Sequence, residues 1–318
     1  MAPLHHSAGT AGLTARRAFL RQTACAGALA GSAFSRPSDL ATIALGNKRV
    51  SRLVAGSNPV FGGTHLSRKL GDHMKAFFTL ERTVSFLKHC EEEGITAFQS
   101  AYAEKVRDAL RAVWEKGSRL QWICLSDERD RERFGDILAL KPIAIAHHGT
   151  TTDGYFRAGQ QQKVADFVKM VHDKGPIAGI STHNPDHLRR ASDSGWEEQF
   201  YMCCFYDIYR APEEIKAKVG DSVVGELYLA SDPERMTGRM RQIGKPCLGF
   251  KILAASRLCW DKASTERAFA FAFENIKPTD GIIVGMYPVF SDEVREDAGL
   301  VRKHGSPPSR SSLQFQGR

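Results

Sequence analysis

Residues 142–148 read Pro-Ile-Ala-Ile-Ala-His-His, and residues 177–183 read Ile-Ala-Gly-Ile-Ser-Thr-His. Each stretch is a short apolar run that ends in polar side chains, which is typical of a strand buried on both faces. Residues 160–174, which lie between them, favour an amphipathic helix. A strand, a helix and a second strand in this order predict a parallel βαβ unit.

The same alternation repeats along the chain and predicts eight units. The strands are expected at residues 52–56, 96–100, 121–125, 142–146, 177–181, 200–205, 247–253 and 281–284. The helices that follow them are expected at residues 80–93, 104–116, 133–140, 160–174, from Asn184-Pro185 onward, 233–243, 264–275 and 291–302. Residues 44–48 and 50–56 predict a short hairpin that leads into the first strand. Eight consecutive units of this kind predict an α/β protein with a (β/α)8 TIM barrel.

The size and charge of the chain are compatible with one barrel enzyme. Its 318 residues and 42% hydrophobic content suffice for a single barrel, which we expect at residues 44–304. The formal net charge of +8 comes from Lys and Arg residues that are scattered along the chain, and this scatter argues against a nucleic-acid partner. The long connection at residues 58–78 is expected to form a lid.

The two ends of the chain differ in composition from the barrel. Arg16 and Arg17 precede the mildly apolar run 23–34, so residues 1–36 resemble a twin-arginine signal. This resemblance implies a transient partner, the twin-arginine translocase, and a periplasmic or extracellular location. The run is too short and too rich in Gly and Ala to form a stable membrane anchor. Residues 305–318 are polar and rich in Ser and Pro, and we expect them to be disordered.

Polar side chains stand at the carboxyl ends of the predicted strands, which meet at one mouth in this type of barrel. The predicted catalytic residues are Gln99, Tyr102, His147, His148 and Lys251. Two polar imidazoles at the end of an apolar strand are unfavourable in a hydrophobic core, so His147 and His148 are the strongest candidates. An ammonium inside the apolar run around Lys251 is unusual and suits a base or a Schiff-base amine.

Several stretches resemble the aldo/keto reductase family. They are Leu-Gly at 45–46 with Val-Ser-Arg-Leu at 50–53, residues 94–101, residues 179–188 and residues 268–297. The likeness is one of organisation and extends from about residue 45 to residue 300. It implies a TIM-barrel oxidoreductase that uses NADP(H), with cofactor contacts at Ser181, Thr182 and Gly285.

The catalytic set of that family is largely altered here. Those reductases use Asp, Tyr, Lys and His, whereas this chain has Gln99 at the Asp position and Ser126 near the Lys position. The histidine is retained as His147 or His148. A neutral Gln cannot stabilise a Lys ammonium, and without that Lys the pKa of a nearby Tyr is not lowered. The resemblance therefore implies an enzyme for small polar carbonyl or hydroxyl compounds, including sugar-derived ones, while disfavouring ordinary NADPH-dependent reduction.

Two further functions are compatible with the same residues. His183, Asp127 and Asp207 follow strands of the predicted barrel and could bind a divalent metal. Such a metal would polarise a hydroxy-carbonyl substrate and make the protein a lyase, an isomerase or an epimerase. A third hypothesis is a barrel that binds a small molecule without catalysing a reaction.

Overall fold

The computed structural model describes residues 39–306, and these form a (β/α)8 barrel. Its parallel strands close into a ring in the order β10-β3-β4-β5-β6-β7-β8-β9. The strand bounds are β3 Leu53–Gly56, β4 Ala97–Ala101, β5 Gln121–Ser126, β6 Ala144–His147, β7 Ile177–Thr182, β8 Phe200–Cys204, β9 Cys247–Phe250 and β10 Gly281–Gly285. The TIM barrel predicted from the sequence is confirmed.

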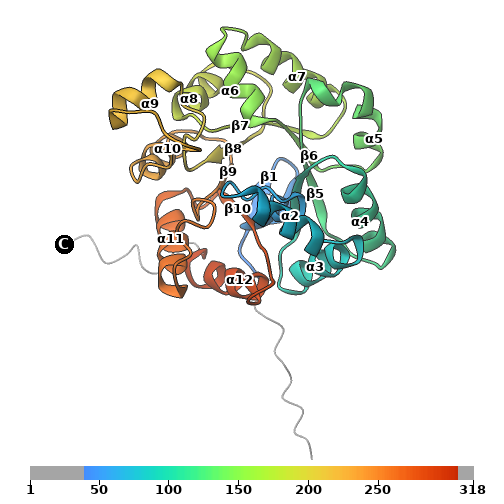
Figure 1. Ribbon diagram of the computed structural model, residues 1–318. Helices are drawn as coiled ribbons and strands as arrows, with labels where there is room; N and C mark the ends of the chain where they lie inside the picture. Colours follow the sequence, from blue (N-terminus) through green and yellow to red (C-terminus); the bar gives the residue numbers. More distant parts are fainter. Residues whose placement is uncertain (1–38, 307–318) are drawn as a thin grey trace, which may run out of the picture. The chain divides into compact units, whose positions relative to one another are not determined.

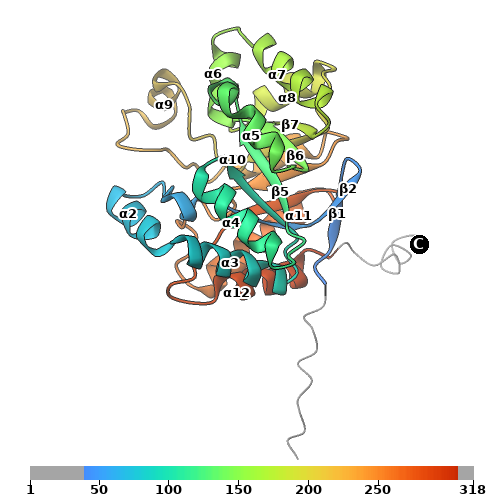
Figure 2. The same ribbon diagram turned by 90° about the vertical axis from the view of Figure 1, so that its right-hand side faces the viewer.

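The predicted hairpin is also present and closes one end of the barrel. Strands β1 (Thr42–Leu45) and β2 (Lys48–Ser51) pair antiparallel. Ile43, Leu45 and Val50 pack against the side chains that fill the interior of the barrel, and all three are buried. Figure 2 shows this hairpin at the end of the barrel opposite to α2 (Arg68–Phe77) and α9 (Pro212–Val219).

Apart from α2, which lies over the strands in this view, the helices surround the strands as a ring, as Figure 1 shows. Besides α2 and α9, their bounds are α3 Leu80–Glu92, α4 Glu104–Glu115, α5 Phe134–Ala139, α6 Gly149–Arg157, α7 Gln162–Asp173, α8 Pro185–Asp193, α10 Asp232–Met240, α11 Lys262–Asn275 and α12 Glu293–His304, with short 3-10 helices η1 Pro59–Phe61 and η2 Glu128–Arg133. The eight predicted helices all appear within a few residues of the expected bounds.

The structure corrects two expectations and adds two helices that were not predicted. The segment after β6, expected to be a loop, forms helix α6, and α2 and α9 form within two other long connections. Strand β9 ends at Phe250, so Lys251 is the first residue after the strand and not part of it. Lys251 has a φ of 58°, which an extended strand does not tolerate.

Some sequence predictions fall on other parts of the chain. The predicted leader, residues 1–36, and residues 307–318 of the predicted tail lie outside the described residues. Within residues 39–306, no helix combines the length and the apolar character that are needed to cross a bilayer.

Candidate functional site

A cavity of about 930 Å³ opens at the carboxyl ends of the barrel strands. The part of the cavity directly above the barrel interior is called the inner end. It is lined by Gln99, His148, Ser181, His183 and Lys251. Apolar side chains of Met202 and Ile283 line the cavity beneath them. The structure therefore brings together side chains from four predicted strand ends, which is where barrel enzymes carry their chemistry.

His183 is held by a buried carboxylate that comes from α6. Its Nδ1 lies 2.8 Å from Asp153 Oδ2, and its backbone N–H donates to the same oxygen at 3.0 Å. The other oxygen of Asp153 accepts from His187 Nδ1 at 2.9 Å and from Thr182 Oγ1 at 2.5 Å. Burial alone would raise the pKa of Asp153, but the hydrogen bonds from His183 and His187 bring that pKa well below its ordinary value. Asp153 is therefore an ionised anchor for His183.

This contact fixes the tautomer of His183. A carboxylate can only accept, so Nδ1 carries the proton and Nε2 has a free lone pair when the ring is neutral. Burial lowers the pKa of His183, although Asp153 acts in the opposite direction. Nε2 has no hydrogen-bond partner among the described residues, and the ring lines the cavity. The pair consequently has the arrangement of a general base with its orienting carboxylate.

His148 lies beside this pair at the start of α6. It is the residue before the first helical turn, and its Nδ1 is buried without a hydrogen-bond partner among the described residues. Burial lowers the pKa of His148 to about 4. The ring is therefore neutral at neutral pH and can exchange a hydrogen bond with a ligand.

Gly149, the first residue of α6, allows the side chains of the inner end to approach one another. A methyl group at this position would lie 2.9 Å from both His183 Cε1 and Ser181 Oγ. These distances are shorter than carbon atoms in proteins tolerate. The positive end of the α6 dipole also faces the cavity here, because Gly149 and Thr150 line it.

Lys251 brings a positive charge to the same place. Its Nζ lies 5.3 Å from the centre of the Phe250 ring, whose other neighbours include the His183 ring at 5.5 Å. Lys251 makes no ion pair with any described carboxylate. Ala254, Ala255 and Ser256 share its left-handed backbone, a conformation that costs non-glycine residues about 1 kcal/mol or more each. Such strain is common where a loop positions a functional group.

Three residues predicted for the site face away from the cavity. His147 lies on the outer face of β6, where Nδ1 contacts Thr152 Oγ1 at 2.7 Å and the ring packs 4.9 Å from Phe167. Tyr102 belongs to the apolar layer between strands and helices. Thr182 points outward to Asp153, while Ser181 and Gly285, the other predicted cofactor contacts, line the cavity. Successive side chains of a strand point to opposite faces, so one of each neighbouring pair faces outward.

The three residues predicted as metal ligands do not form one site. Asp127 accepts hydrogen bonds from Arg129 and from Thr151 Oγ1, the latter at 2.6 Å. Asp207 accepts from Asn184 Nδ2 at 3.0 Å, and burial raises its pKa to about 6. Neither carboxylate lines the cavity that contains His183. Each is already paired within the protein, which leaves no common coordination sphere.

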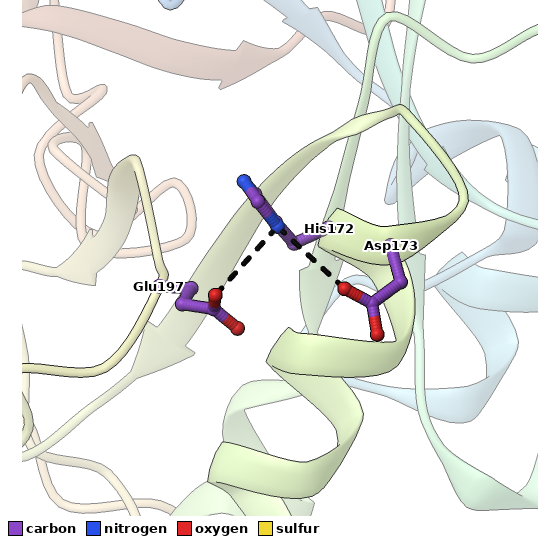
Figure 3. A group of neighbouring side chains, drawn as sticks. All are labelled: His172, Asp173 and Glu197. Carbon is purple, nitrogen blue, oxygen red and sulfur yellow. Dashed lines mark ion pairs between the residues drawn. The ribbon is translucent and has the colours of Figure 1, made fainter.

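Among the described residues, the group with metal-binding spacing lies elsewhere. It consists of His172, Asp173 and Glu197, whose ligand atoms lie within 4.8 Å of one another (Figure 3). All three are exposed and lie at the amino-terminal end of the strands, opposite the cavity. Lys169 Nζ approaches Asp173 at 3.1 Å and Glu197 at 3.9 Å, so an ammonium already neutralises these carboxylates.

The outer part of the cavity, called the acidic end below, has a different charge. Its carboxylates belong to Asp261, Glu266, Glu293, Glu296 and Asp297. The cation that lines this end, Lys262, is paired with Glu296 at 3.0 Å. The diphosphate of a nicotinamide dinucleotide is anionic and needs positive or N–H-rich surroundings. The residues present do not fit such a cofactor, although the resemblance to the reductases implies one.

Three loops that are distant in the sequence meet over the mouth. His65 Nδ1 lies 2.7 Å from Glu226 Oε1, and Glu226 Oε2 accepts from the Tyr228 hydroxyl at 3.0 Å. Arg257 stacks 4.0 Å above the Tyr228 ring and donates to the His65 carbonyl at 3.1 Å. Although burial would raise the pKa of Glu226, the contacts with His65 lower it. The predicted lid, residues 58–78, is thus attached to the connections after β8 and β9.

Comparisons with known proteins agree with the fold. No protein-family model matches the chain, and no curated protein matches it. The apo structure of Gox0644 matches with a TM-score of 0.52 at 10% identity, covering 86% of this chain and 92% of that chain. The glycerol dehydrogenase AKR11B4 from Gluconobacter oxydans matches with a TM-score of 0.46 at 12% identity, covering 85% of this chain and 98% of that chain. A truncated 3-deoxy-D-arabino-heptulosonate 7-phosphate synthase from Thermotoga maritima matches with a TM-score of 0.48 at 11% identity, covering 83% of this chain and 90% of that chain. The likeness to Gox0644 shows a shared barrel fold, and the reaction has to be inferred from the cavity.

Proposed function

We propose that the protein is a barrel enzyme that moves a proton on a small polar hydroxy-carbonyl compound, as an isomerase, an epimerase or a lyase does. The observation that carries this proposal is the Asp153–His183 pair, whose free Nε2 belongs to a ring that lines the cavity. Proton transfer by a positioned imidazole contributes typically about 10²- to 10⁴-fold to a rate.

The proposed step needs no group that the chain lacks. His183 Nε2 takes the proton from the carbon next to the carbonyl, and the electron pair of that C–H bond moves to the carbonyl oxygen as an enolate. If the enolate turns in the cavity, return of the proton to the other face of the same carbon gives an epimer. If the proton is instead delivered to the former carbonyl carbon, and the hydroxyl proton of the neighbouring carbon passes to the former carbonyl oxygen, the new carbonyl forms at that neighbouring carbon and the product is an isomer. Asp153 stabilises the imidazolium that forms in between.

The charges of the inner end support this step. Among the described residues that line it, Lys251 brings a full positive charge and no carboxylate is present. An ammonium and the amino end of α6 both stabilise a negative charge that develops on oxygen. His148 and Ser181 can bind the hydroxyl groups of the substrate.

Exchange of substrate hydrogen with solvent tests the proposal. The protein is incubated in deuterated water with a panel of hydroxy-aldehydes, hydroxy-ketones and aldonic acids, and deuterium incorporation is followed by NMR. We expect incorporation next to the carbonyl of at least one compound, and His183→Gln should lower its rate by about 100-fold or more.

His147→Gln is the matched control because this imidazole lies outside the cavity. It should retain the exchange rate of the unmodified protein. Absence of exchange across the whole panel, or an unchanged rate in His183→Gln, would contradict the proposal. The former outcome would favour a binding barrel.

Descent from the aldo/keto reductases and export through the twin-arginine route are also proposals. The barrel, the hairpin at its base and the sequence likeness support the former, and Arg16 and Arg17 support the latter. Replacing both arginines by lysine should retain the protein in the cytoplasm of a host with this route, which cell fractionation measures.

A further inference from the structure

The cavity is larger than the proposed proton transfer requires. Its volume of about 930 Å³ lies near the upper limit for small-molecule pockets. The inner end occupies the region above the barrel strands, whereas the acidic end is built from the amino end of α11 and from α12. A ligand that fills the cavity therefore extends from Lys251 toward a group of carboxylates.

Four carboxylates of the acidic end have partners within the protein. Asp261 accepts from the Ser264 N–H at 2.7 Å, and Glu293 accepts from the Tyr287 N–H at 2.5 Å. Glu266 contacts Lys303 at 2.5 Å and His304 at 3.1 Å. Glu296 contacts Lys262 at 3.0 Å and Ser291 at 2.8 Å. Asp261 caps α11, and Glu266 and Glu296 form ion pairs between α11 and α12. Glu293 binds the backbone of the connection before α12.

Asp297 is the exception. Its side chain lines the cavity and the residue is only 6% exposed, yet it has no hydrogen bond or ion pair with any described residue. Burial raises its pKa well above the ordinary value, and the nearby Glu293 and Glu296 raise it further. A buried polar group without a partner is costly, and such groups in native proteins commonly have a partner that the protein alone does not supply.

The surroundings of Asp297 define the kind of partner. Leu300, one helical turn after Asp297 on α12, also lines the cavity, as do Met74 and Tyr287, so the cavity offers an alkyl chain apolar contacts. No three carboxylates of the acidic end bring their oxygens within 4.8 Å of one another, which is the spacing that a metal ion needs. An alkylammonium group supplies positive charge, hydrogen-bond donors and an apolar stem together, and its charge favours the ionised form of Asp297 on binding.

We infer that the acidic end binds the alkylammonium group of a ligand, with Asp297 as its counter-ion. The substrate class is then a hydroxy-carbonyl compound whose far end carries a protonated amine. The carbonyl part of this statement rests on the proposed function, whereas the ammonium site does not.

Two probes of equal length test the ammonium site without any turnover. n-Pentylammonium and neutral 1-pentanol are titrated into the full-length protein by calorimetry at low ionic strength. The ammonium should bind about tenfold or more tightly than the alcohol, because a hydrogen bond to a charged group is worth more than a neutral one. In Asp297→Asn this preference should disappear.

Two further variants separate this inference from the proposed function. Glu197→Gln removes a carboxylate at the opposite end of the barrel and should keep the preference. His183→Gln should also keep it while losing deuterium exchange. Equal affinities of the unmodified protein for the two probes, or a full preference in Asp297→Asn, would overturn the ammonium site. Since the first comparison needs no variant, it decides the matter even if Asp297→Asn does not fold.

Discussion

His147 and His148 are adjacent imidazoles in opposite environments. His147 lies behind β6 with Thr152 and Phe167, whereas His148 lines the cavity with a buried, unpartnered Nδ1. The sequence predicted that this pair matters but could not assign the two faces. A strand of a parallel barrel is apolar on both sides, so residues 142–146 contain no alternation that marks the inner face.

The pH dependence of stability tests the environment of His148. Its pKa is lowered to about 4 in the folded protein, whereas an exposed histidine has a pKa near 6.5. Between these values the unfolded state binds more protons, so stability rises with pH across this window and is lost as the pH falls through it. His148→Gln should remove up to about 3 kcal/mol of this dependence between pH 4 and 6.5. Denaturant unfolding at several pH values measures it, and an unchanged slope would contradict the burial of this ring.

For Asp297 we predict the opposite pH dependence of stability. Burial raises the pKa of Asp297 in the folded protein, and the neighbouring Glu293 and Glu296 raise it further. The folded state therefore binds more protons, and the contribution of Asp297 to stability falls as the pH rises above the unfolded value near 3.9. Asp297→Asn should gain stability relative to the unmodified protein when the pH is raised from 4 to 8. A loss in that direction would indicate a structural ion pair instead of a ligand site.

At the scale of elements, α6 is the part of the site that the sequence did not reveal. Gly149, Gly154 and the threonines between them are weak helix formers, and the segment was expected to be a loop. Packing against β7 overrides this preference. Asp153 was missed for the same reason, because only a helix places it on the buried face with Phe156 and aims it at His183.

Gly149→Ala tests the role of the first turn of α6. The added methyl group would lie 2.9 Å from His183 Cε1, so the ring or the helix has to move. Exchange activity should fall about tenfold or more, since a displacement near 1 Å is costly for catalysis. Gly154→Ala is the matched control, because no atom lies within 4 Å of its added methyl group. It should keep the activity and stabilise the helix by roughly 0.5–1 kcal/mol. Equal activities in the two variants would contradict the proposed packing of His183.

At the scale of the whole molecule, the order of strands and helices followed from the sequence because each βαβ unit is local. The contacts between the loops at the mouth could not be predicted from the sequence, because His65 and Glu226 are 161 residues apart. Neither residue belongs to a pattern with short spacing. Only the closed ring brings the connections after β3, β8 and β9 to the same mouth.

Glu226→Gln tests whether these loops hold one another. The amide of Gln carries no charge, so the ion pair with His65 Nδ1 would be lost. We expect faster proteolysis at residues 57–67 with little change in the unfolding midpoint, because the loops open locally. Asp193→Asn, which breaks an exposed ion pair with Arg189, should leave the cleavage rate unchanged. Equal cleavage in both variants would show that the loops are held by other contacts.

The hairpin β1–β2 limits the routes by which a ligand can reach the cavity. Since Ile43, Leu45 and Val50 fill the base of the barrel, the hairpin blocks access to the cavity from that end. If the proposed function holds, reactant and product both enter and leave at the carboxyl ends of the strands, so the product should inhibit competitively.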